Sequence, residues 1–176
     1  MAACIETECA VRLLGLGNEL LADDAFGILV AREVERRQAK ACPTGGACFS
    51  LPVPATDVVC SSASGFHLLD HVLGVKRLVV VDTLATSAGV PGTIHVFRWS
   101  CGAGAFACQP VAPHFVGLFD ILAAAANLGL DAPQEVTVIG VEAADCVTVG
   151  GEMHPDVRAA AVWAADIAEG VLAAMV

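Results

Sequence analysis

The stretch that decides the fold is residues 13–27, which read LLGLGNELLADDAFG. Residues 11–16 form a short apolar run, typical of a strand that is covered on both faces. Gly15 and Gly17 let the backbone turn sharply behind that strand, because glycine has no Cβ atom to clash. Glu19 would then follow at the carboxyl edge of the predicted sheet, where open α/β folds usually bind ligands. We therefore expect a functional site to begin at Glu19.

A dinucleotide-binding loop is the obvious alternative for this glycine turn. That loop needs a third glycine where this chain has Leu20, and an acidic residue at the end of the second strand, which is missing. Glu19 would also repel a pyrophosphate group, whereas such loops offer free backbone N–H groups. Nucleotide binding is therefore disfavoured.

The composition bounds the class of protein. The 176 residues fit one domain, residues 1–176, and the net charge of −10 would repel nucleic acid. The hydrophobic fraction is 56%, yet no uninterrupted apolar stretch approaches the ~20 residues of a membrane span. The N-terminus lacks the basic start and apolar core of a signal peptide. We expect a cytoplasmic protein that binds neither nucleic acid nor membrane.

The chain has eight cysteines, and in a cytoplasmic α/β domain we expect them to be reduced. No two stand in a C-x-x-C spacing, so a zinc knuckle or a redox dithiol is disfavoured. Cys101 and Cys108 share a glycine-rich loop and could pair, although packing of the loop is the favoured role. The eight are Cys4, Cys9, Cys42, Cys48, Cys60, Cys101, Cys108 and Cys146.

Apolar periodicity predicts alternating strands and helices along the rest of the chain. Residues 24–40 read as a helix that Asp23 or Asp24 can cap, with Phe26, Leu29, Val30 and Val34 facing inward. Residues 93–99 alternate as an edge or antiparallel strand, and residues 102–113 form a long loop. The other predicted strands are 47–53, 77–82 and 136–141, and the other helices are 64–74, 113–128 and 155–175. The sheet should be mixed and mainly parallel.

Three polar residues lie at positions where an α/β fold usually places its functional site. Glu19 follows the first strand, Asp82 ends the strand at 77–82, and His114 begins a helix. Two carboxylates and an imidazole could bind a divalent metal and leave positions for water or substrate. Taken singly, each has a structural alternative: a solvated acid, a cap, or a first-turn residue. We expect all three at the exposed carboxyl edge of the sheet.

The remaining histidines and the nucleophile motifs point to no second site. His67 and His71 lie four apart without the glutamate of an H-E-x-x-H motif, and His95 and His154 read as structural. The chain has no G-x-S-x-G elbow and no Cys–His nucleophile motif, so an acyl-enzyme mechanism has no support.

The motifs together resemble the hydrogenase maturation endopeptidases, over nearly the whole chain. The matching residues are 15–21 (GLGNELL), Asp23-Asp24, Gly27, 79–82 (VVVD), Pro91-Gly92, Pro113-His114, Gly117-Leu118 and 139–141 (IGV). The resemblance implies a three-layer α/β/α fold. It also implies an endopeptidase that removes a C-terminal peptide from the nickel-loaded large-subunit precursor of a hydrogenase. Glu19, Asp82 and His114 would be the catalytic residues, in contact with the nickel of that precursor.

One departure from this family concerns Cys60. The family commonly has Asp-Gly-Gly-Thr after its second strand, and here that aspartate falls on Cys60, followed by Ser61-Ser62-Ala63. Three explanations stay open: Asp57 or Asp70 substitutes for the acid, Cys60 is a soft nickel ligand, or the loop suits another hydrogenase subclass.

The sequence thus predicts a monomeric, metal-guided, non-serine endopeptidase whose nickel comes with the substrate and which needs no organic cofactor. Its partner would be the hydrogenase large-subunit precursor. The first rival is an assembly factor that senses nickel without cleaving, which the missing acid at Cys60 favours. The second is an unrelated metal-dependent hydrolase that binds its own ion.

Overall fold

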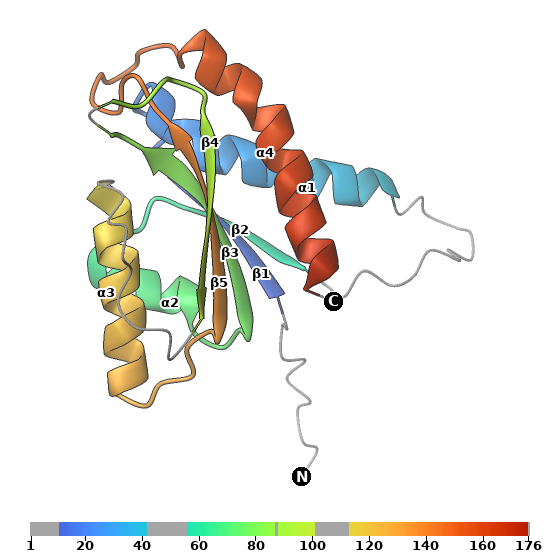
Figure 1. Cartoon of the computed structure of the whole chain (residues 1–176), viewed down its shortest axis with the longest axis vertical. Coiled ribbons are helices and arrows are strands. Elements are labelled where there is room, and N and C mark those ends of the chain that lie inside the picture. The colour runs from blue at the N-terminus through green and yellow to red at the C-terminus, as the bar shows by residue number, and fades with distance from the viewer. Residues whose placement is uncertain (1–10, 42–55, 87, 101–112, 176) are drawn as a thin grey trace.

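A computed structural model describes residues 11–41, 56–86, 88–100 and 113–175 of the chain. Five strands form one sheet in the order β2-β1-β3-β5-β4 (Figure 1). The first four of these strands are parallel, and β4 at the edge is antiparallel to β5. Their bounds are β1 Val11–Leu16, β2 Asp57–Ser61, β3 Arg77–Leu84, β4 Ile94–Ser100 and β5 Glu135–Glu142. The sheet is mixed and mainly parallel, as the sequence predicts.

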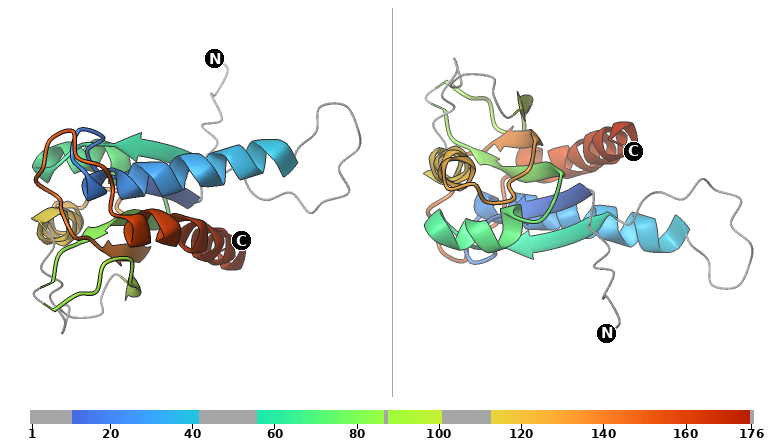
Figure 2. Two further views of the ribbon diagram at one scale, coloured as in Figure 1. Left: turned by 90° about the horizontal axis from the view of Figure 1, so that it is seen from above. Right: turned by 90° about the horizontal axis from the view of Figure 1, so that it is seen from below.

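Helices cover both faces of the sheet and complete a three-layer α/β/α fold (Figures 1 and 2). On one face lie α1 (Phe26–Ala41) and α4 (Pro155–Ala174), which share a hydrophobic cluster with the strands. On the other face lie α2 (Leu69–Val72) and α3 (Pro113–Asn127). Two short 3₁₀ helices, η1 (Asp23–Ala25) and η2 (Gly65–Leu68), lead into α1 and α2. This confirms the expected fold class.

Strand β3 shows how alternation assigns side chains to the two faces. Val79 and Val81 are fully buried against α1 and α4, whereas Leu78 and Val80 are buried against α2 and α3. Asp82 is two residues beyond Val80 and therefore belongs to the face that α2 and α3 cover.

Helix α1 packs so closely on the sheet that only glycine fits at the contact. A Cβ atom added to Gly27 would lie 2.1 Å from the carbonyl oxygen of Leu16 and 2.3 Å from that of Val81. The turn that follows β1 is therefore fixed against the start of α1.

The sequence reading missed one strand and placed one side chain wrongly, and one predicted strand falls outside the described residues. The second described strand is β2 at Asp57–Ser61, which the sequence reading missed, while the predicted strand at 47–53 falls outside the described residues. Val58 and Val59 pair with Leu13 and Leu14 of β1, so β2 depends on a partner strand that local pattern does not reveal. Leu29 was expected to face inward but is exposed, because it lies on the same side of α1 as the exposed Arg32 and Arg36, three and seven residues further on.

The other predicted helices and strands are present close to their expected bounds, except that 64–74 is divided into η2 and α2. The loop at 102–113, apart from Pro113, and the pair Cys101 and Cys108 lie outside the described residues. Within the described part of the chain, no helix is long and apolar enough to cross a bilayer.

Candidate functional site

The carboxyl ends of β1 and β3 and the first turn of α3 lie at the same end of the sheet (Figure 1). A Cβ atom added to Gly117 would lie 3.9 Å from the backbone nitrogen of Gly65, so α3 begins beside the turn that follows β2. The fold therefore brings the segments that carry Glu19, Asp82 and His114 to one end of the molecule.

Asp82 is fully buried, which corrects the expectation of an exposed position at the sheet edge. Its Oδ1 accepts a hydrogen bond from the backbone N–H of Thr83 at 2.8 Å, whereas Oδ2 finds no partner among the described residues. Burial, helped by the negative charge of nearby Asp24, raises the pKa of Asp82 to about 8, although the hydrogen bond from Thr83 opposes the shift. Asp82 is thus mostly protonated at neutral pH when the site holds no cation.

Glu19 is exposed in the loop after β1, and its carboxylate binds Arg32 of α1. The two hydrogen bonds of this fork measure 2.5 and 3.0 Å, and Glu19 raises the pKa of Arg32 by hydrogen bonding and by its charge. The carboxylate of Glu19 is therefore held toward α1, while Asp82 belongs to the opposite face of the sheet. The two residues share an end of the sheet, but their carboxylates have different surroundings.

His114 lies in the first turn of α3, directly after Pro113, as the sequence predicts. Its side chain lies outside the described part of the structure. Among the side chains that are described, no group of three or more histidine, cysteine, aspartate or glutamate residues could hold a metal ion.

Asp23 joins three segments at this end of the sheet and does not act as the helix cap that the sequence suggested. It is fully buried, and its two carboxylate oxygens accept hydrogen bonds from the backbone N–H groups of Ala144, Asp145 and His154 at 2.6–2.9 Å. These donors belong to the loop between β5 and α4, far away in the sequence. Asp23 therefore ties the loop that carries Glu19 to that second loop.

A buried glutamate on β5 is a feature that the sequence reading missed. Glu142 accepts hydrogen bonds from the backbone N–H and the hydroxyl of Thr86 at 3.2 and 2.9 Å, and lies 3.3 Å from Nε2 of His95. His95 is thus a partner of a buried acid at the carboxyl end of the sheet. The only signal in the sequence was the acid that directly follows a core strand.

Cys60 lies within β2 rather than after it, and its Sγ is 3.9 Å from the carbonyl oxygen of Ile28 in α1. Burial raises the pKa of this thiol, and the charge of Arg32 opposes that effect. Asp57 begins the same strand about 10 Å away and forms an ion pair with Arg12, and Asp70 is exposed on α2. Asp57 is therefore at the wrong end of the sheet to replace the missing acid.

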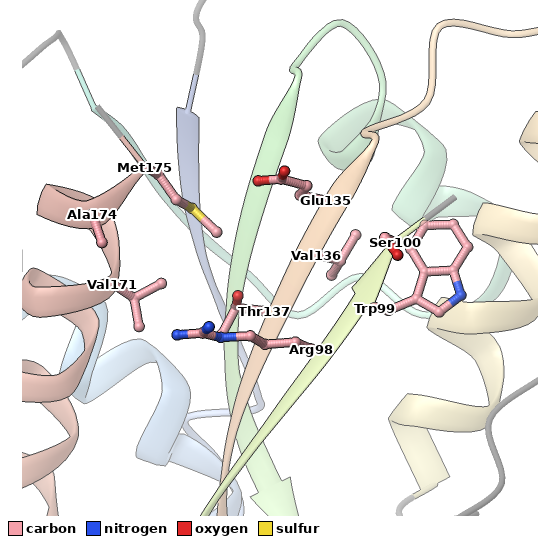
Figure 3. Close-up of a pocket in the computed structure, with 9 residues that line it drawn as sticks. All are labelled: Arg98, Trp99, Ser100, Glu135, Val136, Thr137, Val171, Ala174 and Met175. Atoms are coloured by element: carbon pink, nitrogen blue, oxygen red, sulfur yellow. The ribbon is translucent and has the colours of Figure 1, made fainter. Parts of the chain in front are cut away.

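Two of the cavities among the described residues lie at opposite ends of the molecule. A cavity of about 340 Å³ adjoins Glu19 and Arg32 and also involves Glu152 and Arg158. A second, of about 360 Å³, lies between β4, β5 and the end of α4, where Arg98, Thr137 and Met175 line it (Figure 3). This second cavity is at the amino end of β5, far from Asp82, so only the first belongs to the candidate site.

Solved structures with the same fold define the class to which this chain is similar. A hydrogenase maturating endopeptidase, HybD from Escherichia coli, superposes with a TM-score of 0.70 at 22% identity, covering 93% of this chain and 91% of that one. A [NiFe] hydrogenase maturation protease, HybD from Thermococcus kodakarensis, superposes with a TM-score of 0.69 at 24% identity, covering 93% and 99%. The fold is that of the hydrogenase-processing endopeptidases.

Sequence similarity then decides the family. The family model for hydrogenase maturation proteases (HycI) matches residues 52–171, a span that includes Asp82 and His114 but not Glu19. The hydrogenase 2 maturation protease of Escherichia coli K12 is 27% identical over 131 residues, covering 74% of this chain and 71% of the relative. HupD of Bradyrhizobium diazoefficiens, a hydrogenase expression/formation protein, is 26% identical over 163 residues, covering 93% and 78%. The chain belongs to the hydrogenase maturation proteases, endopeptidases that cleave the C-terminus of the hydrogenase large-subunit precursor.

Proposed function

We propose that the protein recognises the nickel centre of its precursor and cleaves only the nickel-loaded form, with Glu19, Asp82 and His114 in contact with that nickel. The observation that most supports this proposal is Asp82, a fully buried carboxyl group with one oxygen lacking a partner among the described residues. It lies at the carboxyl end of β3, where α/β folds bind ligands. The likeness to a [NiFe] hydrogenase protease agrees with nickel as the metal.

Nickel carried by the substrate would change the charge balance at both acids. A cation beside Asp82 favours the ionised carboxylate, so nickel would displace the proton that burial retains. Glu19 is held only by an exposed ion pair, and exposed pairs of this kind add little stability. Glu19 can therefore exchange Arg32 for nickel at a small cost and turn toward the site.

In this proposal the metal is the specificity signal. The three side chains fill positions on the nickel and so place the scissile peptide bond. A water that is bound to the substrate's nickel or activated by a carboxylate then attacks the peptide carbonyl. The protein itself would work as a cytoplasmic monomer without an organic cofactor. Its net charge of −10 also disfavours a nucleic-acid partner.

The test incubates the protein with the precursor, with and without nickel, and follows the mass of the precursor's C-terminus. We expect cleavage only with nickel, and its loss in Glu19→Gln, Asp82→Asn and His114→Ala. Glu35→Gln, an exposed acid on α1, and His67→Ala, an exposed histidine of η2, are the matched controls and should cleave normally. Equal processing of the nickel-free precursor would refute the proposal.

The non-cleaving assembly factor is the second candidate, because Cys60 stands where the family resemblance expects an acid and Asp57 lies too far away. It predicts a protein that binds the nickel-loaded precursor while the precursor's mass stays unchanged. Cys60→Asp distinguishes the two readings, since an aspartate that creates or raises cleavage would identify a weakened family loop. Cys60→Ser should retain activity if the thiol only packs against α1.

A further inference from the structure

The loop after β1 and the loop after β5 run side by side at the end of the sheet where Asp82 lies (Figures 1 and 2). The backbone N–H of Gly150 donates to the carbonyl of Leu20 at 2.8 Å, and that of Ala22 donates to the carbonyl of Thr148 at 3.2 Å. Between these bonds Leu21 and Val149 form an antiparallel bridge. The two loops are thus joined into one short ribbon.

Two aspartate side chains hold this ribbon in place by accepting hydrogen bonds from backbone N–H groups. Asp23 accepts three backbone hydrogen bonds across it, as described above, and Oδ1 of Asp145 accepts from the backbone N–H groups of Val147 and Thr148 at 2.9 Å each. Many of the backbone N–H groups of the ribbon are therefore satisfied within the protein. A surface built in this way keeps its shape before any partner arrives.

Beside exposed Thr148, the ribbon presents three aliphatic side chains outward. Leu20 is 68% exposed, Val147 82% and Val149 74%, and we call these three residues the apolar rim. Single exposed aliphatic residues are ordinary on protein surfaces. Three of them on one hydrogen-bonded ribbon, directly beside Glu19, form a contact surface next to the candidate site.

We propose that the apolar rim docks the folded body of the hydrogenase large-subunit precursor. This inference rests on the proposed function, which brings the precursor to Glu19, and the exposed Leu20 is the next residue in the chain. A specific protein complex covers about 800 Å² on each partner, far more than the site residues alone provide. A preordered aliphatic ribbon supplies such contact without the entropic cost of ordering loops.

The test compares Leu20→Glu with Leu128→Glu. Leu128 is 72% exposed and directly follows α3, at the opposite end of the molecule from the site, so both changes place a charge at an equally exposed leucine. With nickel-loaded precursor, we expect Leu20→Glu to raise KM about tenfold with kcat little changed, which corresponds to about 1.4 kcal/mol of binding. Leu128→Glu should leave both constants unchanged. Val147→Glu tests the second loop in the same way.

A rim that is not a docking surface gives other results. Wild-type KM in both Leu20→Glu and Val147→Glu, with unchanged unfolding midpoints, would overturn the proposal. If Leu20→Glu folds poorly, Leu20→Ala takes its place in the test. Leu20→Ala adds no charge and should raise KM by a smaller factor than the one expected for Leu20→Glu. A wild-type protein that forms a dimer, broken by Leu20→Glu, would identify the rim as a contact between two copies and would also overturn the proposal.

The failure of the proposed function is distinguishable from the failure of the rim. If the wild-type protein binds the nickel-loaded precursor but does not cut it, the cleavage proposal fails, and a binding titration with the same variants still decides the rim. If it neither binds nor cuts that precursor, both proposals fail.

Discussion

At the scale of single residues, Asp82 combines complete burial with a carboxyl oxygen that lacks a partner among the described residues. Burying a charge without compensation is expensive, so the protonated form dominates and the pKa rises to about 8. A buried, protonated carboxyl group with an oxygen unpaired among the described residues adds no evident packing contact. It is, however, suited to a site that receives a cation only when the substrate arrives.

The stability of the protein should therefore depend on pH through Asp82. Its folded-state pKa of about 8 lies above the ordinary value of 3.8, so the folded chain retains a proton that the unfolded chain loses in this window. The contribution of Asp82 to the free energy of unfolding should fall as pH rises from about 4 to 8, by up to about 1.4 kcal/mol per pH unit. Asp82→Asn has no such proton. Urea unfolding at several pH values should show that the free energy of unfolding of Asp82→Asn increases relative to that of the wild type as pH rises. Parallel plots of this free energy against pH would contradict the prediction.

Asp23 should matter for stability rather than for chemistry. Asp23→Ala removes the buried acceptor of three partly buried backbone N–H groups, and we expect a loss of about 3 kcal/mol in the free energy of unfolding. Asp120→Ala, an exposed residue on α3, is the control and should change stability little. Denaturant unfolding measures both. Equal stability of the two variants would show that the join between the loops is dispensable.

At the scale of elements, the contact of α1 with β1 and β3 fixes the geometry of the first loop. The absence of a side chain at Gly27 lets the backbone of α1 approach the carbonyl groups of Leu16 and Val81 directly. Because the loop with Glu19 connects β1 to α1, its position depends on this contact. The packing of α1 on β1 and β3 therefore fixes the position of Glu19, which lies in none of these three elements.

The substitution Gly27→Ala should therefore destabilise the folded protein strongly. Its Cβ atom would lie 2.1 Å from a carbonyl oxygen, so α1 must shift, and we expect a loss of about 3 kcal/mol in the free energy of unfolding or failure to fold. Gly170→Ala on α4 is the matched control, since a Cβ atom there meets open space and alanine favours the helix by up to about 1 kcal/mol. Thermal unfolding of both variants checks the pair, and a tolerated Gly27→Ala would mean that α1 can move without consequence.

At the scale of the whole molecule, the three layers gather acids from separate segments at one end of the sheet. Glu19 and Asp23 follow β1, Asp82 lies near the end of β3 and Glu142 ends β5, and these acids have different partners or none among the described residues. The described side chains do not, however, form a metal-binding group of three.

Because the proposal places nickel in the substrate, removal of metal should leave the protein unchanged. We expect that dialysis against a chelator leaves the unfolding midpoint the same, and that metal analysis of the purified protein finds much less than one ion per chain. A structural or catalytic ion of its own would stabilise the folded state by mass action. One tightly held ion per chain, with a lower midpoint after chelation, would instead favour an unrelated metal-dependent hydrolase.

The amino-acid sequence alone predicts most of the elements and their order, because β-branched runs, helical periodicity and glycine turns are local signals. From these it placed Glu19, Asp82 and His114 at the carboxyl end of a mainly parallel sheet, since strand direction decides which loops meet. It missed β2, whose valines needed β1 as a partner. It also turned Leu29 inward, at a helix position where the sheet provides no cover.

The surroundings of each acid depend on how the elements pack in three dimensions. The sequence suggested that Asp23 could cap a helix, but its partners are backbone N–H groups more than a hundred residues away. Glu142 was passed over because Thr86 and His95 approach it from other strands and loops. Asp82 was expected at an exposed edge, yet it is buried, because exposure depends on how the layers close over the strand end. Burial and long-range hydrogen bonds arise from packing, and local sequence pattern carries no record of them.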